Sequence, residues 1–179
     1  AAGVVINSLN WQAEHLPLHK LFEDEVPQEA LERKFAAASE MEMRAYNNLA
    51  WGALPHTPTK SMLGVSGFGP NINLARDPRF GRSSELPGED PLLSGRYAVE
   101  MVGGMQQKDA SGYPKMLAYL KHYSAYSKEA GRFTWTANVS AFDWHDSYLP
   151  QFEMGFRLGN ASGAMCSYFS GSEPRSATP

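Results

Sequence analysis

The sequence predicts an α/β protein in which parallel strands alternate with helices. Two observations lead to this prediction. Short runs of apolar and β-branched residues recur along the chain, and polar loops follow them. Several of these loops lead into segments with apolar residues at three- and four-residue steps, which is the spacing of an amphipathic helix. A strand, a loop and a helix make one βα unit, and repeated units of this kind build a parallel sheet.

Length and charge narrow the class of protein. The 179 residues fit a single domain over residues 1–179 and suffice for a sizeable core. The net charge of −3 gives no reason to expect nucleic acid or an anionic membrane as a partner. No apolar run approaches the roughly 20 residues that a membrane span needs, and the first residues lack the pattern of a signal peptide. We therefore expect no membrane span.

The sequence says little about the compartment. The single cysteine, Cys166, excludes an internal disulfide and leaves the redox environment open. Two glycosylation sequons begin at Asn138 and Asn160. They favour a secreted or vesicular location, although such triplets also arise by chance.

The first half of the chain predicts one strand and two helices. Residues 3–9 form a β-branched run that predicts a buried strand, and residues 28–50 form the clearest helix. Its predicted inward stripe is Leu31, Phe35, Ala38, Met41, Ala45 and Leu49. A second helix is predicted from Pro91 to about Gln107, with Asp90 as its N-cap. The inward residues expected there are Leu93, Tyr97, Met101 and Gly104.

The second half predicts two strands around a third helix. Residues 116–123 are mostly apolar and predict a buried strand that ends in polar groups. Residues 147–159 predict a helix that Asp146 caps and Gly159 stops. Residues 163–169 predict a last strand, and we expect the small polar residues after it to be loose.

The loop that follows residues 71–74 is the first candidate for a functional segment. Residues 70–91 read PNINLARDPRFGRSSELPGEDP, and residues 71–74 are expected to be a short strand. The charged residues of the loop are Arg76, Asp77, Arg79, Arg82, Glu85, Glu89 and Asp90. In a βα barrel the loop after a strand carries binding groups, but a charged loop can also be no more than a solvated surface.

Three further places carry polar groups that could be functional. Lys121 and His122 stand where a barrel strand reaches its carboxyl end, although a lone pair of this kind is more often on the surface. The segment 11–15 holds a tryptophan, a glutamate and a histidine that could form a sugar platform or an ordinary loop. The acids and histidine of segment 143–146 could suggest a metal, but caps and surface residues are the more common outcome, so we expect no metal.

The stretch 70–91 resembles the signature segment of glycoside hydrolase family 3, which contains β-glucosidases and β-xylosidases. Members of its xylosidase-like branch carry a run similar to PNIN-x-x-RDPR-aromatic-GR followed by E-x-PGEDP. Three later stretches are similar to family motifs, namely K-H-aromatic at 121–123, TANVSAFDWHD at 136–146 and M-C-S-Y at 165–168. Phe169 departs from the asparagine that is usual there. The resemblance runs from about Asn10 to Tyr168.

This resemblance implies a partial (β/α)8 TIM-like barrel, the N-terminal barrel domain of such an enzyme. A complete barrel takes about 200–250 residues or more, and we count four or five strands here, so the domain is expected to be incomplete. The implied reaction is the retaining hydrolysis of terminal β-linked glucose or xylose, without a cofactor. The implied substrate-binding residues are Arg82, Lys121, His122 and Tyr168.

The resemblance assigns no catalytic residue to this chain. In the family the nucleophile lies a few dozen residues beyond the M-C-S-Y segment, and the acid/base usually comes from a later domain. Glu85, Glu89 and Asp90 are expected to order the arginines and to cap a helix. We therefore expect the isolated chain to be inactive and to need the missing part of the barrel or another chain as a partner beside its carbohydrate substrate.

Two alternatives to an active enzyme segment stay open at this point. The chain could be an inactive member of the family that serves as a structural or sugar-binding subunit of a larger assembly. It could also be an unrelated βα protein whose loop imitates the signature.

Overall fold

The computed structural model describes residues 28–53, 65–168 and 170–171. Its main sheet holds three parallel strands in the order β1-β2-β4, where β1 is Ser66–Asn71, β2 is Leu117–Tyr123 and β4 is Gly163–Cys166. Helix α4, Pro91–Met105, connects β1 to β2, and helix α6, Pro150–Arg157, precedes β4. Strands and helices thus alternate in two successive βα units, which confirms the predicted α/β class.

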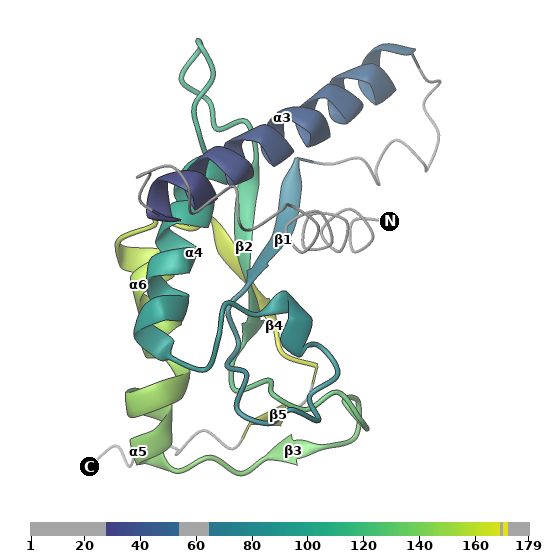
Figure 1. Cartoon of the computed structure of the whole chain (residues 1–179). Coiled ribbons are helices and arrows are strands. Elements are labelled where there is room, and N and C mark those ends of the chain that lie inside the picture. The colour runs from purple at the N-terminus through teal and green to yellow at the C-terminus, as the bar shows by residue number, and fades with distance from the viewer. Residues whose placement is uncertain (1–27, 54–64, 169, 172–179) are drawn as a thin grey trace, which may run out of the picture.

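The helices pack on one side of the sheet. Helices α4 and α6 lie side by side there, and α3, Gln28–Ala53, crosses the end of α4 (Figure 1). A separate pair of two-residue strands, β3 at Thr136–Ala137 and β5 at Ser170–Gly171, lies below the carboxyl ends of the main strands. Loops therefore occupy the carboxyl edge of the main sheet.

Strand β1 lies earlier than predicted. The expected strand at 71–74 follows β1, because β1 occupies Ser66–Asn71 and includes Gly67, Gly69 and Pro70. These residue types usually mark turns. A Cβ at Gly67 would lie 2.2 Å from Met116 Cε, so a larger residue there would require the methionine side chain to move. The close approach of β1 to the methionine side chain therefore overrides the local preference for a turn.

Helix α4 begins as predicted. Asp90 is its N-cap and accepts a hydrogen bond of 2.6 Å from the Leu93 amide, with Pro91 in the first turn. Leu93, predicted to face inward, is 46% exposed, and Tyr97 is half-buried. The buried face is instead made of Ser94, Gly95, Ala98, Met101, Val102, Gly104 and Met105. The predicted stripe was therefore only half right, because small residues rather than Leu93 approach α6 and the sheet.

Helix α3 is confirmed, and Phe35 of its predicted inward stripe packs against the core, but most of the rest of that stripe is exposed. Met41 and Leu49 are 58% and 63% exposed, whereas Ala36 and Glu40 are fully buried. Helix α3 crosses α4 at a point where a Cβ on Gly104 would lie 2.5 Å from that of Ala36. Small residues, rather than the long apolar ones, thus allow the two helices to approach.

The predicted helix at 147–159 is divided. A short helix α5, Ala141–Asp143, is followed by a π-helical turn, Trp144–Tyr148, before α6 begins at Pro150. Asp146 therefore lies inside the turn and is not the cap. The cap of α5 is Ser140, whose hydroxyl accepts a 3.0 Å hydrogen bond from the Asp143 amide. Proline at the first position of α6 explains the break, since it donates no backbone hydrogen bond.

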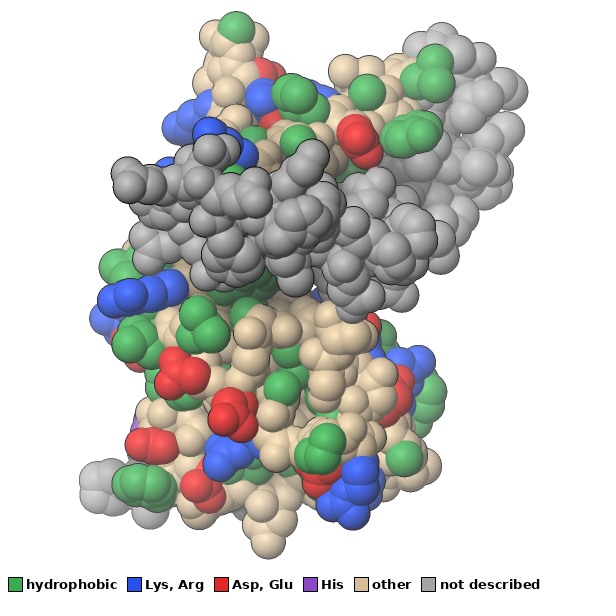
Figure 2. All heavy atoms as spheres, in the orientation of Figure 1, with side chains coloured by type: hydrophobic (Ala, Val, Ile, Leu, Met, Phe, Trp, Pro, Cys, Tyr) green, Lys and Arg blue, Asp and Glu red, His purple; other side chains and the backbone are tan. Residues whose placement is uncertain are grey.

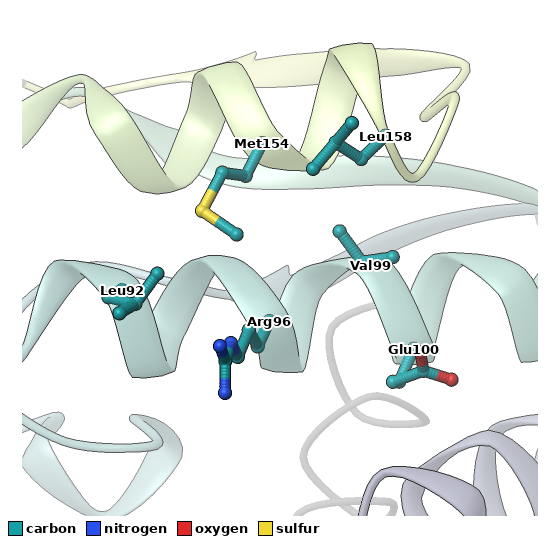
Figure 3. Close-up of a pocket in the computed structure, with 6 residues that line it drawn as sticks. All are labelled: Leu92, Arg96, Val99, Glu100, Met154 and Leu158. Carbon is teal, nitrogen blue, oxygen red and sulfur yellow. The ribbon is translucent and has the colours of Figure 1, made fainter.

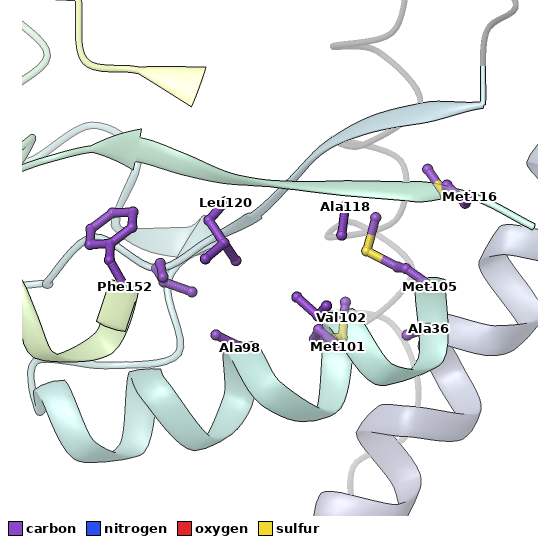
Figure 4. Close-up of a cluster of buried hydrophobic side chains, with 10 residues drawn as sticks. Ala36, Ala98, Met101, Val102, Met105, Met116, Ala118, Leu120 and Phe152 are labelled. Atoms are coloured by element: carbon purple, nitrogen blue, oxygen red, sulfur yellow. The ribbon is translucent and has the colours of Figure 1, made fainter. Parts of the chain in front are cut away.

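The main core lies between the sheet and its helices (Figure 4). It contains Ala36, Ile72, Ala98, Met101, Val102, Met105, Met116, Ala118, Leu120 and Phe152. Each buried methylene group contributes about 0.8 kcal/mol to this packing. Within the described residues, no helix is long and apolar enough to cross a membrane. On the face seen in Figure 2, acidic and basic side chains are interspersed.

Some predictions fall outside the described residues. They concern the strand at 3–9, the aromatic and polar segment 11–15, and the loose C-terminus. The last predicted strand is described over Gly163–Cys166 and ends before Ser167.

Candidate functional site

The four predicted binding residues lie together at the carboxyl ends of the strands. Lys121 and His122 belong to the end of β2, Arg82 to the loop after β1, and Tyr168 follows β4. Arg82 Nη1 lies 3.0 Å from His122 Nε2, and the rings of His122 and Tyr168 have centroids 5.3 Å apart. The parallel order of the strands explains this convergence, because parallel strands end on the same edge. A role of these residues in binding stays a prediction.

Glu85 is the central anion of the cluster. Its Oε1 accepts a 2.6 Å hydrogen bond from Arg82 Nε, and its Oε2 accepts one of 2.7 Å from Arg82 Nη2. Oε2 also accepts a 3.0 Å hydrogen bond from Asn71 Nδ2 and lies 3.9 Å from Lys121 Nζ. Burial opposes ionisation of Glu85, but the donors of Arg82 and Asn71 outweigh burial and lower its pKa. One carboxylate thus faces two cations, which leaves these three side chains with a net positive charge.

Lys121 is a buried cation whose pKa is lower than that of an ordinary lysine. Its side chain is 5% exposed. Burial lowers its pKa to about 8, and the nearby carboxylate of Glu85 opposes that shift. The ammonium group therefore stays charged at neutral pH and has three donors.

Asn73 and His122 form a closed set of hydrogen bonds. Asn73 Nδ2 donates to the His122 carbonyl over 2.9 Å, and the His122 amide donates to Asn73 Oδ1 over 2.9 Å. His122 Nδ1 lies 3.1 Å from the same oxygen. Burial, followed by the charges of Arg82, Lys121 and Arg132, lowers the pKa of His122 to about 3. The imidazole is therefore neutral at physiological pH.

Aromatic rings form the wall next to His122. Tyr126 and Tyr168 have ring centroids 5.6 Å apart, and each ring also contacts the imidazole. The Tyr126 hydroxyl donates to Glu129, and burial together with this bond raises the pKa of Tyr126 to about 12. The Arg132 guanidinium lies 4.3 Å from the centroid of Tyr168. Tyr126 is fully buried and Tyr168 is half-buried, so the wall packs the imidazole among aromatic rings.

The other charges of the 76–90 loop lie apart from this cluster. Arg79 is an exposed partner of Asp77, with a 2.6 Å contact that holds the pKa of Asp77 at about 2. Arg76 lies over the Tyr148 ring at 5.4 Å. Of the three acids in the prediction, Glu85 orders Arg82 and Asp90 caps α4, as expected, while Glu89 is exposed.

Two hollows lie elsewhere on the described part of the chain. One, of about 490 Å³, separates the outer faces of α4 and α6 and is shown in Figure 3; Leu92, Arg96, Val99, Glu100, Met154 and Leu158 line it. The other, of about 540 Å³, is lined by Ala141, Phe142, His145 and Asp146. The structure places no group of three potential metal ligands together among the residues that it describes. Cys166, at the end of β4, is free and exposed.

Taken together, a parallel sheet with helices on one face and polar groups at its carboxyl edge defines an α/β class of protein. Residues 59–178 match the family described as the glycosyl hydrolase family 3 N-terminal domain. The chain therefore belongs to glycosyl hydrolase family 3, which confirms the resemblance seen in the signature segment.

Relatives that are named for their activities support the same family. The chain is 45% identical over 113 residues to beta-xylosidase/alpha-L-arabinofuranosidase 1 of Medicago sativa subsp. varia, which covers 60% of this chain and 15% of that protein. It is 38% identical over 144 residues to exo-1,4-beta-xylosidase bxlB of Emericella nidulans, with 78% and 17% covered. The chain thus spans less than a fifth of the length of these relatives.

Solved structures show the fold of the same family. A GH3 exo-beta-xylosidase, XlnD, in complex with a xylobiose aziridine probe, superposes with a TM-score of 0.68 at 26% identity, over 80% of this chain and 18% of that one. Beta-glucosidase 3B from Thermotoga neapolitana, in complex with alpha-D-glucose, gives a TM-score of 0.65 at 26% identity, over 80% and 17%. The predicted partial TIM-like barrel is therefore confirmed.

Sequence reasoning missed the part that Asn71 and Asn73 take in the cluster. Asparagine is depleted in strands, so two asparagines in a run expected to be a strand were a signal that polar side chains are needed there. Tyr126 was also missed, and nothing in its sequence surroundings separates it from an ordinary loop tyrosine.

Proposed function

We propose that this chain is part of a retaining β-glycosidase that hydrolyses terminal β-linked glucose or xylose. In this proposal, residues 1–179 belong to one incomplete barrel domain, which supplies the shell that holds the terminal sugar and does not supply the nucleophile. Membership in the family supports the reaction class, and the relatives are named as β-xylosidases and β-glucosidases.

The observation that carries the proposal is the buried meeting of Arg82 and Lys121 around the Glu85 carboxylate, with His122 in contact with Arg82. Glu85 offsets one of the two positive charges and leaves several of the N–H groups of Arg82 and Lys121 available. These donors suit the vicinal hydroxyls of a pyranose, and the ring of Tyr168 closes the same place. Loss of one such charged, desolvated contact costs on the order of 1.5–3 kcal/mol.

The proposal assigns the carboxylates of the cluster to support rather than to bond breaking. A retaining glycosidase needs two carboxyl groups roughly 5–5.5 Å apart that can reach the sugar. Glu85 already accepts hydrogen bonds from Arg82 and Asn71, and Glu129 accepts from Tyr126 and Arg132. The proposal therefore takes the nucleophile and the acid/base from outside these residues.

Hydrolysis of aryl glycosides tests this proposal. The protein expressed at its full native length is expected to cleave 4-nitrophenyl β-D-xylopyranoside or the corresponding glucoside with retention of configuration, and the 179-residue chain alone is expected to show no turnover. Turnover by the 179-residue chain would overturn the assignment of the nucleophile. Sugar binding without turnover at native length would favour the alternative of an inactive, sugar-binding family member.

Replacement of Lys121 tests the binding shell directly. Lys121→Met keeps the length of the side chain and removes its three donors, so kcat/KM of the native-length protein is expected to fall about 10- to 150-fold. The matched control is Lys128→Met, because Lys128 is exposed and its ammonium lies 4.8 Å from the Trp135 ring. Equal activities of the two variants would remove Lys121 from the shell.

A further inference from the structure

We propose that Asn160 carries an N-linked glycan whose first sugars lie over the apolar hollow between helices α4 and α6. Two observations lead to this proposal, namely a glycosylation sequon on an exposed turn and an uncovered apolar hollow next to it. Neither belongs to the polar cluster at the carboxyl ends of the strands, so the proposal does not rest on the proposed function.

The sequon at Asn160, Ala161 and Ser162 forms the turn between α6 and β4. Asn160 is exposed and has a φ of +58°, the left-handed conformation that asparagine and glycine adopt most readily. Its backbone amide donates to the Phe156 carbonyl over 3.1 Å, and its carbonyl accepts from Gln106 Nε2 over 2.8 Å. Within the described part of the chain, its side-chain amide takes part in no such bond, so Nδ2 is free for a covalent attachment.

The two sequons of the chain differ in how the hydroxyl of their serine is used. N-linked glycans are transferred while the chain is synthesised, before distant residues meet. Ser162 Oγ donates over 2.6 Å to a glutamine 56 positions away, so this hydroxyl is free at that stage. In the sequon of Asn138, Ser140 Oγ instead accepts from the Asp143 amide three residues on, and such a local cap can form early. We therefore expect higher occupancy at Asn160.

Asn160 lies at the amino ends of the main strands, away from the candidate site. The Ser162 amide of the same turn donates over 3.1 Å to the carbonyl of Ala118, at the start of β2. Asn138 instead directly follows β3, which lies near the carboxyl ends of the strands (Figure 1), and its neighbour Val139 packs against the aromatic cluster. A glycan on Asn160 therefore leaves the candidate site open.

The hollow next to Asn160 is largely apolar and is open to solvent. Leu158, in its lining, is 68% exposed and lies two residues before Asn160. Gly159, between them, approaches α4 so closely that a Cβ there would lie 3.2 Å from Val99 Cα. The hollow thus ends where the sequon begins. Its apolar lining comes from both helices, namely Leu92, Val99, Met154 and Leu158 (Figure 3). Contiguous exposed apolar surface of this kind marks a place where another group binds.

The hollow fits N-acetylglucosamine, the first sugar of an N-linked glycan. Its volume of about 490 Å³ lies within the range of about 300–1,000 Å³ that is typical of small-molecule sites. The apolar face of the pyranose ring and the acetyl methyl group suit the aliphatic lining. Arg96, exposed at the same hollow, offers guanidinium donors to the hydroxyl and acetyl oxygens. Glu100 is already paired with Arg33 over 2.6 Å, so it does not compete for Arg96.

Attachment of the glycan replaces one N–H bond of Asn160 by a bond to carbon. Nδ2 bonds to C1 of an oligosaccharide that is carried on a lipid pyrophosphate, and the bond between C1 and the phosphate oxygen breaks. Nδ2 releases one proton and the lipid pyrophosphate leaves, so the step needs no oxidant or reductant. The lipid-linked oligosaccharide and the transferring enzyme belong to the secretory pathway of a eukaryotic cell.

Mass spectrometry of the native-length protein, secreted from yeast, tests the occupancy of Asn160. Trypsin separates the two sequons into peptides 133–157 and 158–175. Peptide-N-glycosidase in ¹⁸O-water converts each glycosylated asparagine to an ¹⁸O-labelled aspartate. We expect this label on Asn160 in most molecules. A bare Asn160 overturns the proposal, whether or not Asn138 is labelled.

Hydroxyl-radical labelling of the same protein tests whether the glycan covers the hollow. Asn160→Gly is the unglycosylated comparison, because glycine adopts the left-handed backbone of this position without strain. Since a glycan is bulky, Leu158 and Met154 are expected to be labelled about twofold less in the wild type than in this variant. Phe133, which is 72% exposed on the loop after β2, should be labelled equally in both.

Asn138→Gln is the matched control for this comparison, since it removes the other sequon at an exposed position. It is expected to leave the labelling of Leu158 and Met154 as in the wild type. Equal labelling of these two residues in the glycosylated wild type and in Asn160→Gly overturns the covering of the hollow. Because neither readout depends on glycoside hydrolysis, failure of the proposed function leaves both results interpretable.

Discussion

The two ends of β2 differ in what their buried side chains do. Met116, which immediately precedes the strand, and Ala118 and Leu120 within it are buried among apolar neighbours of α4 and α6. The next two residues, Lys121 and His122, are just as buried, at 4% and 1% exposure, but they bind charged and polar groups. The first end is stabilised by apolar packing, so a substitution that leaves a cavity there destabilises the fold. The second end is stabilised by paired charges, so a substitution that removes one partner destabilises the fold. One strand therefore joins the core to the candidate site.

Glu85→Gln is the strongest test of the charged end. The substitution leaves Arg82 and Lys121 without their buried counter-charge, so we expect the free energy of unfolding to fall by about 3–5 kcal/mol. Urea unfolding of the 179-residue chain measures it. Glu89→Gln, at an exposed position of the same loop, is the matched control and should change it by less than about 0.5 kcal/mol. A loss below about 1 kcal/mol in Glu85→Gln would show that the cluster is effectively solvated.

Leu120→Ala tests the apolar end. Leu120 is fully buried, and its removal is expected to cost about 2–5 kcal/mol of unfolding free energy. Because Leu120 does not belong to the polar cluster, KM of the native-length protein for an aryl xyloside should stay the same in the folded fraction. The control is Leu158→Ala, since Leu158 is 68% exposed. A large rise in KM would show that the two ends of β2 are not independent.

Unfolding measured at acidic pH tests whether His122 stays neutral in the folded protein. Its folded pKa of about 3 lies below the ordinary value of 6.5, so the unfolded chain binds more protons between these values. The stability from this group is fully present above about pH 6.5 and is lost as the pH falls towards 3. At pH 4 the loss is on the order of 2–3 kcal/mol. Unfolding free energies of wild type and His122→Gln from pH 7 to pH 4 should diverge by that amount, whereas His145→Gln, at an exposed position, should follow the wild type.

Arg79→Ala is expected to have the smallest effect. Arg79 pairs with Asp77 in the same loop as Arg82, but its side chain is 89% exposed. Exposed ion pairs contribute about 0–1 kcal/mol, so we expect unfolding free energy to change by no more than about 0.5 kcal/mol and kcat/KM to stay the same. Activity loss like that expected for Lys121→Met would extend the candidate site to this arginine.

The sequence predicted the order of the elements better than their faces. The cap at Asp90 and the polar end of β2 could be predicted because each depends on residues next to one another in the chain. The buried face of α3 could not, because it depends on where α4 crosses. There Glu40 is buried and paired with Lys115 over 2.9 Å, a contact between residues 75 positions apart. Local periodicity contains no information about such a partner.

The candidate site shows the same limit. Motif resemblance identified Arg82, Lys121, His122 and Tyr168, and the fold brings them to one edge. It did not indicate that Asn73 contacts His122, because the two residues are 49 positions apart and meet only when β1 and β2 pair. The position of β1 was also missed, since its glycines and proline are residue types that usually mark turns.

The exposed thiol of Cys166 gives this chain a built-in place for a reporter. It is the only cysteine of the sequence and stands two residues before Tyr168, at the end of β4. A maleimide dye would therefore attach at one defined point beside the aromatic wall, without any engineered mutation. A ligand that binds at the neighbouring cluster is expected to change the emission of this dye during a titration.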